Sequence, residues 1–184
     1  MPARIRLLTK IATIILVLVF GAVILRLANR GDDVTYKLTS GIATNVDNKG
    51  SQLVEVDLLT ISGETISTSA LIGRPAIINI WYSTCEPCRR ELPVLAQGAL
   101  EYNDKVRFVG VNIKDSARVA SEFASKYGVD FEIYLDNSGA FISKSGIGTA
   151  PVTLAVNAQG VIINQIAGEL SVAKLDELVA ELLK

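Results

Sequence analysis

An apolar segment that leads directly into the chain's only two cysteines constrains the fold most strongly. Residues 76–82 read AIINIWY, without a charge, and Pro75 precedes them. A continuous apolar run of this length is typical of a strand buried on both faces of a sheet. Cys85 and Cys88 follow, and apolar residues at helical spacing then occupy 90–103. The sequence therefore predicts a buried strand, a cysteine pair at its end and a helix that begins there.

Strand and helix patterns alternate along the rest of the C-terminal part. Residues 53–67 break at Ser62-Gly63-Glu64, which is typical of a β-hairpin. Further strands are predicted at 106–113, 131–135, 152–157 and 161–168, and further helices at 116–128, at 141–146 and after an N-cap at Ser171. This alternation predicts an α/β domain with a mixed central sheet flanked by helices.

An uncharged apolar run at 11–25 predicts contact with lipid. A helix over the 22 positions 7–28 would be about 33 Å long, enough for a hydrocarbon core of about 30 Å. No small-x-small cleavage site follows the run. We therefore expect residues 1–28 to form an uncleaved transmembrane anchor. A cleaved signal peptide and a buried core helix are the alternatives.

Charge separates this segment from the rest of the chain. All five charged residues among the first 30 are basic, whereas the remainder holds 13 basic and 19 acidic groups. Three of the five precede the apolar run, so the positive-inside rule predicts a single-pass protein of the cytoplasmic membrane with its N-terminus inside. Residues 29–50 are polar and glycine-containing, and are expected to form a flexible tether. The domain at 51–184 would then face the extracytoplasmic side of a bacterial envelope.

Cys85-Glu86-Pro87-Cys88 has the spacing of a redox-active CxxC motif. Unpaired N–H groups and the partial positive charge of a helix N-terminus stabilise a thiolate at Cys85. Pro87 is tolerated there because N–H groups of the first turn lack partners. The spacing places Cys88 within disulfide reach but deeper, so Cys85 is predicted to attack and Cys88 to resolve. Glu86 and Pro87, between the thiols, are candidate substrate contacts.

Several classes of protein are excluded or disfavoured. The chain has no histidine, which removes imidazole bases, Cys/His proteases and His-ligated haem. A purely structural disulfide would close only a four-residue loop and stabilise little. Two thiolates are too few for a zinc site, so we expect no metal and no cofactor. The overall charge of -1 is too balanced for a nucleic-acid binder.

Two motifs resemble those of membrane-anchored thioredoxin-like proteins of the ResA/TlpA type. Residues 79–93, NIWYSTCEPCRRELP, are similar to the family's active-site stretch, and residues 148–153, GTAPVT, to its cis-proline loop. The resemblance extends from about residue 50 to the C-terminus. It implies a thioredoxin fold with an N-terminal β-hairpin extension and thiol-disulfide exchange outside the cytoplasm. It also implies cytochrome c biogenesis, with apocytochrome c as substrate and a membrane electron carrier as reductant.

The resemblance assigns roles to further residues. Pro151 matches the cis-proline, which would leave the backbone of Ala150 to pair with an extended substrate. Glu91 matches an acidic residue near the buried thiol, where a carboxyl could exchange a proton. Trp81 matches the family tryptophan and is expected either to contact substrate or to pack in the core.

Two residues differ from those that thioredoxins or the resembling family usually have at the same positions. Asn79 stands where thioredoxins proper keep a buried aspartate, and we expect it to satisfy local hydrogen bonds. Thr84 replaces the tryptophan that usually precedes the first cysteine in the family, so the surface presented to a partner differs.

The sequence thus predicts a membrane-tethered thiol-disulfide oxidoreductase, with reduction of protein disulfides as the leading hypothesis. An oxidase or isomerase uses the same pair: Glu86 and Glu91 disfavour a thiolate, whereas Arg89 and Arg90 favour it. A thiol peroxidase is less favoured, because Tyr82 stands where its motif needs threonine. A non-catalytic copper-binding assembly chaperone is the last alternative, although such domains commonly add a histidine.

Overall fold

The computed structural model describes residues 16, 19–21, 44–102 and 104–184. Its contacts divide the chain into two units, Met1–Gly41 and Ile42–Lys184. Most of the predicted anchor and of the predicted tether lies outside the described residues, so both stay predictions. Within the described part, no helix combines the length and the apolar character that a membrane span requires.

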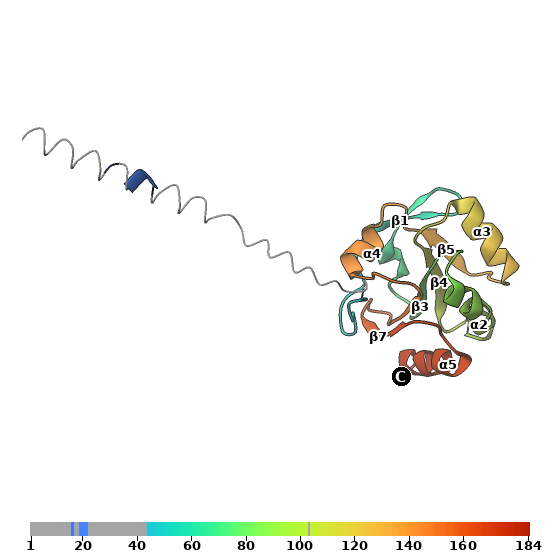
Figure 1. Cartoon of the computed structure of the whole chain (residues 1–184). Coiled ribbons are helices and arrows are strands. Elements are labelled where there is room, and N and C mark those ends of the chain that lie inside the picture. The colour runs from blue at the N-terminus through green and yellow to red at the C-terminus, as the bar shows by residue number, and fades with distance from the viewer. Residues whose placement is uncertain (1–15, 17–18, 22–43, 103) are drawn as a thin grey trace, which may run out of the picture. The chain divides into compact units, whose positions relative to one another are not determined.

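A mixed sheet of seven strands forms the centre of the described domain (Figure 1). The strands are β1 (Asp57–Thr60), β2 (Thr65–Ser67), β3 (Ala76–Trp81), β4 (Arg107–Asn112), β5 (Glu132–Leu135), β6 (Val152–Val156) and β7 (Ile162–Ala167). Their order is β2-β1-β5-β4-β3-β6-β7. The central strands β3, β4 and β5 are parallel, whereas β1, β6 and β7 pair antiparallel to their neighbours. The carboxyl ends of β3 and β4 therefore lie at the same edge of the sheet.

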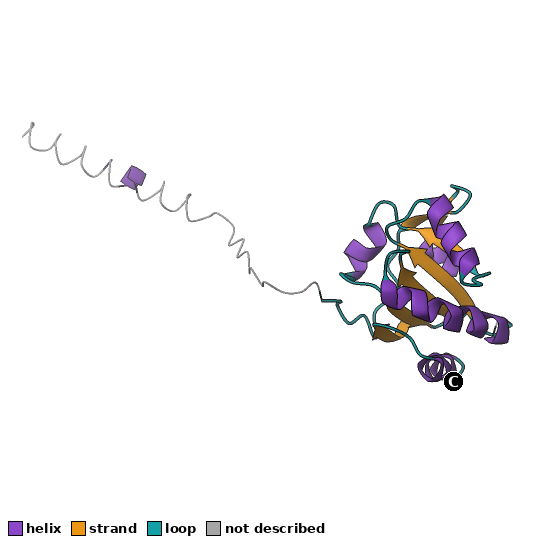
Figure 2. Ribbon diagram, turned by 45° about the vertical axis from the view of Figure 1, so that its right-hand side comes forward, coloured by secondary structure: helices purple, strands orange, loops and turns teal. Residues whose placement is uncertain are grey.

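Helices cover both faces of the sheet (Figure 2). The helices are α2 (Glu86–Tyr102), α3 (Ala117–Lys126), α4 (Ala140–Ser145), α5 (Val172–Leu182) and the short 3-10 helix η1 (Thr68–Leu71). Core residues of α2, α3 and α5 share one apolar cluster, and those of α4 and η1 share another. Along β3, Ile77 and Trp81 belong to the first cluster and Ile78 and Ile80 to the second. The predicted mixed sheet, buried on both faces, is confirmed.

Local sequence signals agree with the observed element boundaries at most positions. The side chains of Ser116 and Ser171 cap α3 and α5 by accepting from the N–H groups of Val119 and Lys174. The predicted hairpin at 53–67 is formed by β1 and β2. Helix α2 begins at Glu86, earlier than the start at 90 that its apolar spacing indicates. Its first turn contains residues of the cysteine motif and exposed charged side chains, so it lacks the apolar pattern.

Residues 44–50 belong to the ordered domain, unlike the flexible tether predicted there. The N–H of Val46 donates to the carbonyl of Gly146 at 3.0 Å, and that of Gly50 to the carbonyl of Ile162 at 2.8 Å. The polar composition of this segment resembles a linker, but its backbone groups form hydrogen bonds with the end of α4 and with β7. The domain therefore extends N-terminal to the predicted boundary at 51.

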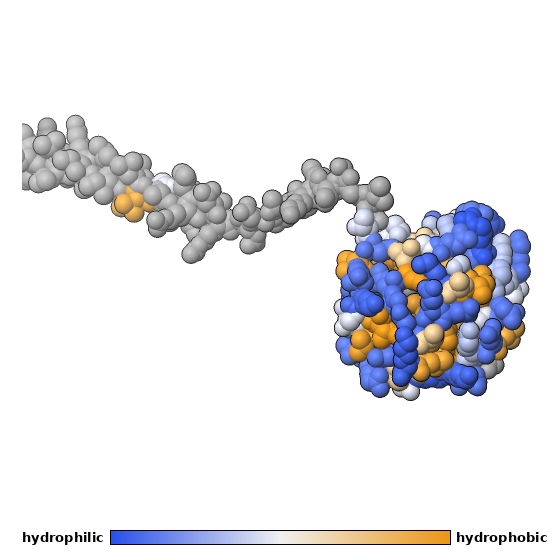
Figure 3. Space-filling model, turned by 90° about the horizontal axis from the view of Figure 1, so that it is seen from below, coloured by the Kyte–Doolittle hydropathy of each residue, from blue (hydrophilic) through white to orange (hydrophobic). Residues whose placement is uncertain are grey.

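The surface of the domain contains both hydrophilic and apolar side chains. The face in Figure 3 shows hydrophilic surface interrupted by scattered apolar patches. Exposed large apolar side chains of the domain are spread along the chain, at Val46, Ile72, Leu100, Val172 and Leu183. Singly scattered apolar residues of this kind are usual on soluble domains and do not mark a binding surface.

Candidate active site

The two cysteines form a disulfide at the start of α2, immediately after the turn that ends β3. Their Cα atoms are 5.3 Å apart. The N–H of Cys88 donates to the Sγ of Cys85 at 3.2 Å, a contact that stabilises negative charge on that sulfur. Cys85 keeps 4% of its surface exposed, whereas Cys88 is fully buried. This difference favours Cys85 as the sulfur that a partner reaches and Cys88 as the resolving thiol.

A carboxylate at the end of β4 holds the turn before Cys85. Asp115 accepts hydrogen bonds from the N–H and the hydroxyl of Ser83, both at 2.7 Å. It also accepts from the side-chain amide of Asn112 at 2.8 Å. Sequence reasoning missed Asp115, although functional groups gather at the carboxyl ends of parallel strands and this residue follows such a strand.

Replacing Asp115 with alanine is expected to lower the free energy of unfolding by about 1–3 kcal/mol, because the half-buried N–H of Ser83 loses its acceptor. Asp115→Asn keeps one acceptor oxygen and should lose less. Urea unfolding monitored by circular dichroism measures both. A change below about 0.5 kcal/mol for Asp115→Ala, the size usual for an uninvolved surface position, would contradict the role.

Glu91 is a fully buried carboxyl on the same helix as the cysteines. Its Oε1 accepts from the side-chain amide of Asn79 at 2.7 Å, and its Oε2 from the N–H of Leu170 at 2.8 Å. Burial raises the pKa of Glu91 to about 7, although these two hydrogen bonds oppose the rise. Lying three residues after Cys88, it shares that face of α2. Glu91 is therefore able to take up and release a proton near neutral pH.

Asn79 links Glu91 to the strand that follows the proline loop. Its Nδ2 donates both to Glu91 and to the hydroxyl oxygen of Thr153, the latter at 3.1 Å. Its Oδ1 is buried without a hydrogen-bond partner among the described residues. The side chain of Asn79 therefore forms hydrogen bonds as expected, but with residues 12 and 74 positions away and, within the described part of the chain, through its Nδ2 alone.

The peptide bond between Ala150 and Pro151 is cis, as predicted. Pro151 is buried, and the half-buried Ala150 packs against the apolar cluster that contains both cysteines. The cysteine turn and the proline loop, about 65 residues apart in sequence, are therefore brought to one site.

Trp81 lies in the core, and the predicted contact with substrate is wrong. Its side chain is fully buried and stacks on Phe123 with ring centroids 5.7 Å apart. A Cβ atom added at Gly110 would lie 2.8 Å from the indole nitrogen. The tryptophan therefore fills space between the sheet and α3, which is the core-packing alternative.

The charged side chains around the motif form ion pairs with one another. Glu86 is exposed and pairs with Arg89 at 3.0 Å and with Arg90 at 3.5 Å. Arg90 also pairs with Glu169 at 2.6 Å. Pro87 is half-buried next to Glu86. Glu86 and Pro87 are thus placed at the surface, where the predicted substrate contacts require them, and the opposing charges offset each other.

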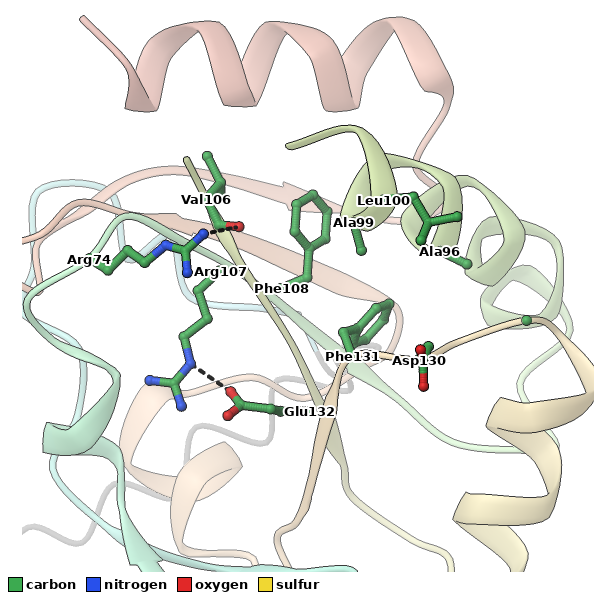
Figure 4. Close-up of a pocket in the computed structure, with 11 residues that line it drawn as sticks. Arg74, Ala96, Ala99, Leu100, Val106, Arg107, Phe108, Asp130, Phe131 and Glu132 are labelled. Atoms are coloured by element: carbon green, nitrogen blue, oxygen red, sulfur yellow. Dashed lines mark hydrogen bonds and ion pairs between the residues drawn. The ribbon is translucent and has the colours of Figure 1, made fainter. Parts of the chain in front are cut away.

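A hollow in the surface of the domain lies away from the cysteines (Figure 4). It has a volume of about 470 Å³, with Phe108 and Phe131 among its lining residues. Arg107, which lines it at the start of β4, forms an ion pair with Glu132 at 2.6 Å. Because β3 and β4 are parallel, the start of β4 is at the opposite edge of the sheet from Cys85. Within the described residues, no three Cys, Asp or Glu side chains converge as a metal site would require.

Comparison with known proteins adds sequence and structural relatives. Residues 48–180 match the model of the Redoxin family. The thiol-disulfide oxidoreductase ResA of Halalkalibacterium halodurans is 30% identical over 136 residues, which cover 73% of this chain and 77% of the relative. ResA of Bacillus subtilis is 27% identical over 125 residues, covering 67% and 70%. A secreted Mycobacterium tuberculosis disulfide oxidoreductase, described as homologous to E. coli DsbE, superposes with a TM-score of 0.61 at 28% identity, covering 69% of this chain and 96% of that one.

Proposed function

The chain belongs to the Redoxin family and is a thioredoxin-like thiol-disulfide oxidoreductase, and on that basis we propose that it reduces protein disulfides while tethered to the outer face of a membrane. The observation that carries the reaction is the Cys85–Cys88 disulfide at the start of α2, beside the cis-proline loop.

The thiol-disulfide exchange proceeds in two steps. The thiolate of Cys85 attacks one sulfur of a substrate disulfide, forming a mixed disulfide and releasing the other substrate sulfur as a thiolate. Cys88 then gives its proton to a base and attacks the Sγ of Cys85, which releases the second substrate thiolate and closes the Cys85–Cys88 disulfide. Two electrons pass to the substrate. The carboxylate of Glu91, on the same face of the helix, is the base we assign to Cys88.

Burial and charge around the pair favour the reducing direction. A pair is more reducing when its thiolates are less stabilised. The positive charges of Arg89 and Arg90 are offset by Glu86 and Glu169. The sulfur of Cys88 is buried among apolar side chains, and the same face of the helix carries the buried carboxyl of Glu91. Neither surrounding stabilises a negative charge on that sulfur. The N–H of Cys88, which stabilises negative charge on the Sγ of Cys85, acts in the opposite direction. We base the choice of a reductase over an oxidase on the buried environment of Cys88.

The reduction potential of the pair tests the direction. We expect a value nearer to that of thioredoxin, about -270 mV, than to that of DsbA, about -120 mV. Equilibration of the full chain in thiol-disulfide buffers, followed by thiol alkylation and mass spectrometry, measures it. A potential close to about -120 mV would favour the oxidase or isomerase and contradict the proposal.

The proposed substrates are proteins with neighbouring cysteines joined in a disulfide, such as apocytochrome c before haem attachment. A membrane electron carrier would return the Cys85–Cys88 pair to the dithiol. Both assignments are supported by the resemblance of residues 79–93 and 148–153 to proteins of the ResA/TlpA type. Apocytochrome c carrying a disulfide, mixed with the reduced chain, should lose that disulfide stoichiometrically.

Membrane tethering is supported by the apolar run at 11–25 and by its described residues. Leu16, Val19 and Phe20 are helical and 69%, 56% and 67% exposed, so they are free to contact lipid. We expect the full chain in the membrane fraction of a bacterial host and a chain lacking residues 1–43 in the soluble fraction. If the full-length gene instead yields a soluble protein that lacks its N-terminal segment, that segment is a cleaved signal peptide.

A further inference from the structure

The segment that precedes β1 lies along the outer edge of β7 (Figure 1). Gln52 forms an antiparallel bridge with Val161, and the N–H of Leu53 donates to the carbonyl of Gly160 at 2.8 Å. Further towards the N-terminus, Asn48 is buried, and its Nδ2 donates to the side-chain oxygen of Gln165 at 2.9 Å. The segment thus covers part of a sheet edge that would otherwise present unpaired backbone groups.

The N-terminal end of this segment contacts the loop that leads to the cis-proline. The Oδ1 of Asn45 accepts from the N–H groups of Gly148 and Thr149, at 2.8 and 2.9 Å. Its Nδ2 donates to the hydroxyl oxygen of Thr149, also at 2.9 Å. One side-chain amide therefore satisfies two consecutive backbone donors and a side chain of the loop, immediately before Ala150 and Pro151.

The position of Asn45 is fixed from its C-terminal side. The N–H of Val46 donates to the carbonyl of Gly146, and the Nδ2 of Asn48 donates to the carbonyl of Ser145 at 3.0 Å. Both acceptors belong to the end of α4, directly before the loop. Asn45 is therefore held against the loop by bonds within the domain.

We propose that Asn45 is a positioning residue for protein substrates, because its amide holds the Gly148–Thr149 backbone so that Ala150 is ready to pair with an extended chain. This inference rests on the proposed function. Gly148 and Thr149 are exposed, and a loop that is already ordered has less conformational freedom to lose when a substrate strand binds. Within the described domain, the side chain of Asn45 forms its hydrogen bonds with Gly148 and Thr149 and not with Cys85 or Cys88. Small disulfides, which do not pair with the loop, should therefore not depend on it.

Replacing Asn45 with alanine in the full chain tests this role. We expect kcat/KM for a disulfide-bonded peptide to fall about tenfold, mainly through KM, because the loop loses its hydrogen bonds. The rate with a small aromatic disulfide should stay within about twofold of wild type. Asn45→Asp keeps an acceptor for the two N–H groups and should recover most of the peptide activity. Asp47→Ala is the matched control, since its exposed side chain accepts from the N–H of Lys49 in the same segment.

Three results would decide against the proposal or against its premise. Equal losses with the peptide and the small disulfide would show that Asn45 only stabilises the fold, and unchanged peptide kinetics would show that it does not position the loop. If Asn45→Ala fails to fold, Thr149→Val is the second test, because it replaces the hydroxyl with a methyl group and so removes the contact with the Nδ2 of Asn45. It must lower peptide activity selectively for the proposal to stand. A wild-type chain that reduces neither disulfide would instead overturn the proposed function.

Discussion

Replacing Cys85 with serine is expected to lower the rate of disulfide reduction by on the order of 10³-fold or more, because a serine hydroxyl is not ionised near neutral pH and cannot attack a disulfide. The measurement is peptide disulfide reduction followed at saturating reductant. Gln97→Ala, an exposed position on the same helix, is the control and should leave the rate within about twofold. If Cys85→Ser retained full activity, disulfide reduction would not depend on the cysteine pair.

Cys88→Ser should behave differently from Cys85→Ser. It keeps the attacking sulfur of Cys85, the more accessible of the two, and loses the resolving one, so the first step proceeds and the second does not. We expect a mixed disulfide with substrate that survives non-reducing electrophoresis and disappears with dithiothreitol. Equal trapping by both variants would contradict the assignment of distinct roles.

Glu91→Gln is expected to change the pH dependence of stability. The pKa of Glu91 is raised to about 7 in the folded protein by burial, so the folded state binds its proton more tightly than the unfolded state, whose carboxyl has its usual pKa near 4.5. The wild type is therefore expected to lose stability as pH rises from about 4.5 to 7, at about 1.4 kcal/mol per pH unit and up to about 3 kcal/mol in total. The glutamine variant lacks this loss.

Urea unfolding of the disulfide-bonded forms at pH 5 and pH 8 measures the effect. The difference in free energy of unfolding between Glu91→Gln and wild type should shift in favour of the variant by about 2–3 kcal/mol at the higher pH. Glu101→Gln, an exposed position on the same helix, should show no such shift. A pH-independent difference between Glu91→Gln and wild type would mean that Glu91 does not titrate in this range.

The same substitution should slow the resolving step by about 10²-fold, because glutamine cannot accept the proton of Cys88. In the wild type, the rate of this step should rise with pH through about 7 as Glu91 becomes a carboxylate. In Glu91→Gln that rise should be absent. Decay of the mixed disulfide after rapid mixing, recorded across this pH range, reports the step directly.

The parts of the fold that depend on neighbouring residues were predictable from the sequence. The apolar run at 76–82, the CxxC spacing and the serine caps each have a local physical cause, and the structure contains the strand, the disulfide and the capped helices. The cis-proline followed from the resemblance of its loop to that of a known family, and the peptide bond at Ala150–Pro151 is cis.

The errors and omissions concern contacts between segments distant in sequence. The side chain of Trp81 stacks on Phe123, which lies far along the chain. A glutamate near the start of a helix usually faces solvent, and Glu91 is instead buried with hydrogen bonds from Asn79 and from the N–H of Leu170, 79 positions away. Asn45 likewise finds its partners 103 and 104 positions along the chain. Sequence periodicity carries no information about such pairs.

Mass mapping of the trapped intermediate tests the central claim most directly. The reduced Cys88→Ser chain is mixed with a disulfide-bonded peptide, alkylated and digested without reductant. We predict one peptide per chain, joined to Cys85, the one cysteine that the variant keeps. The wild type under the same conditions should release the reduced peptide and carry a Cys85–Cys88 disulfide. Two results would contradict the mechanism. The first is a wild-type chain that reduces the peptide without forming the Cys85–Cys88 disulfide, and the second is a variant that carries no peptide on Cys85.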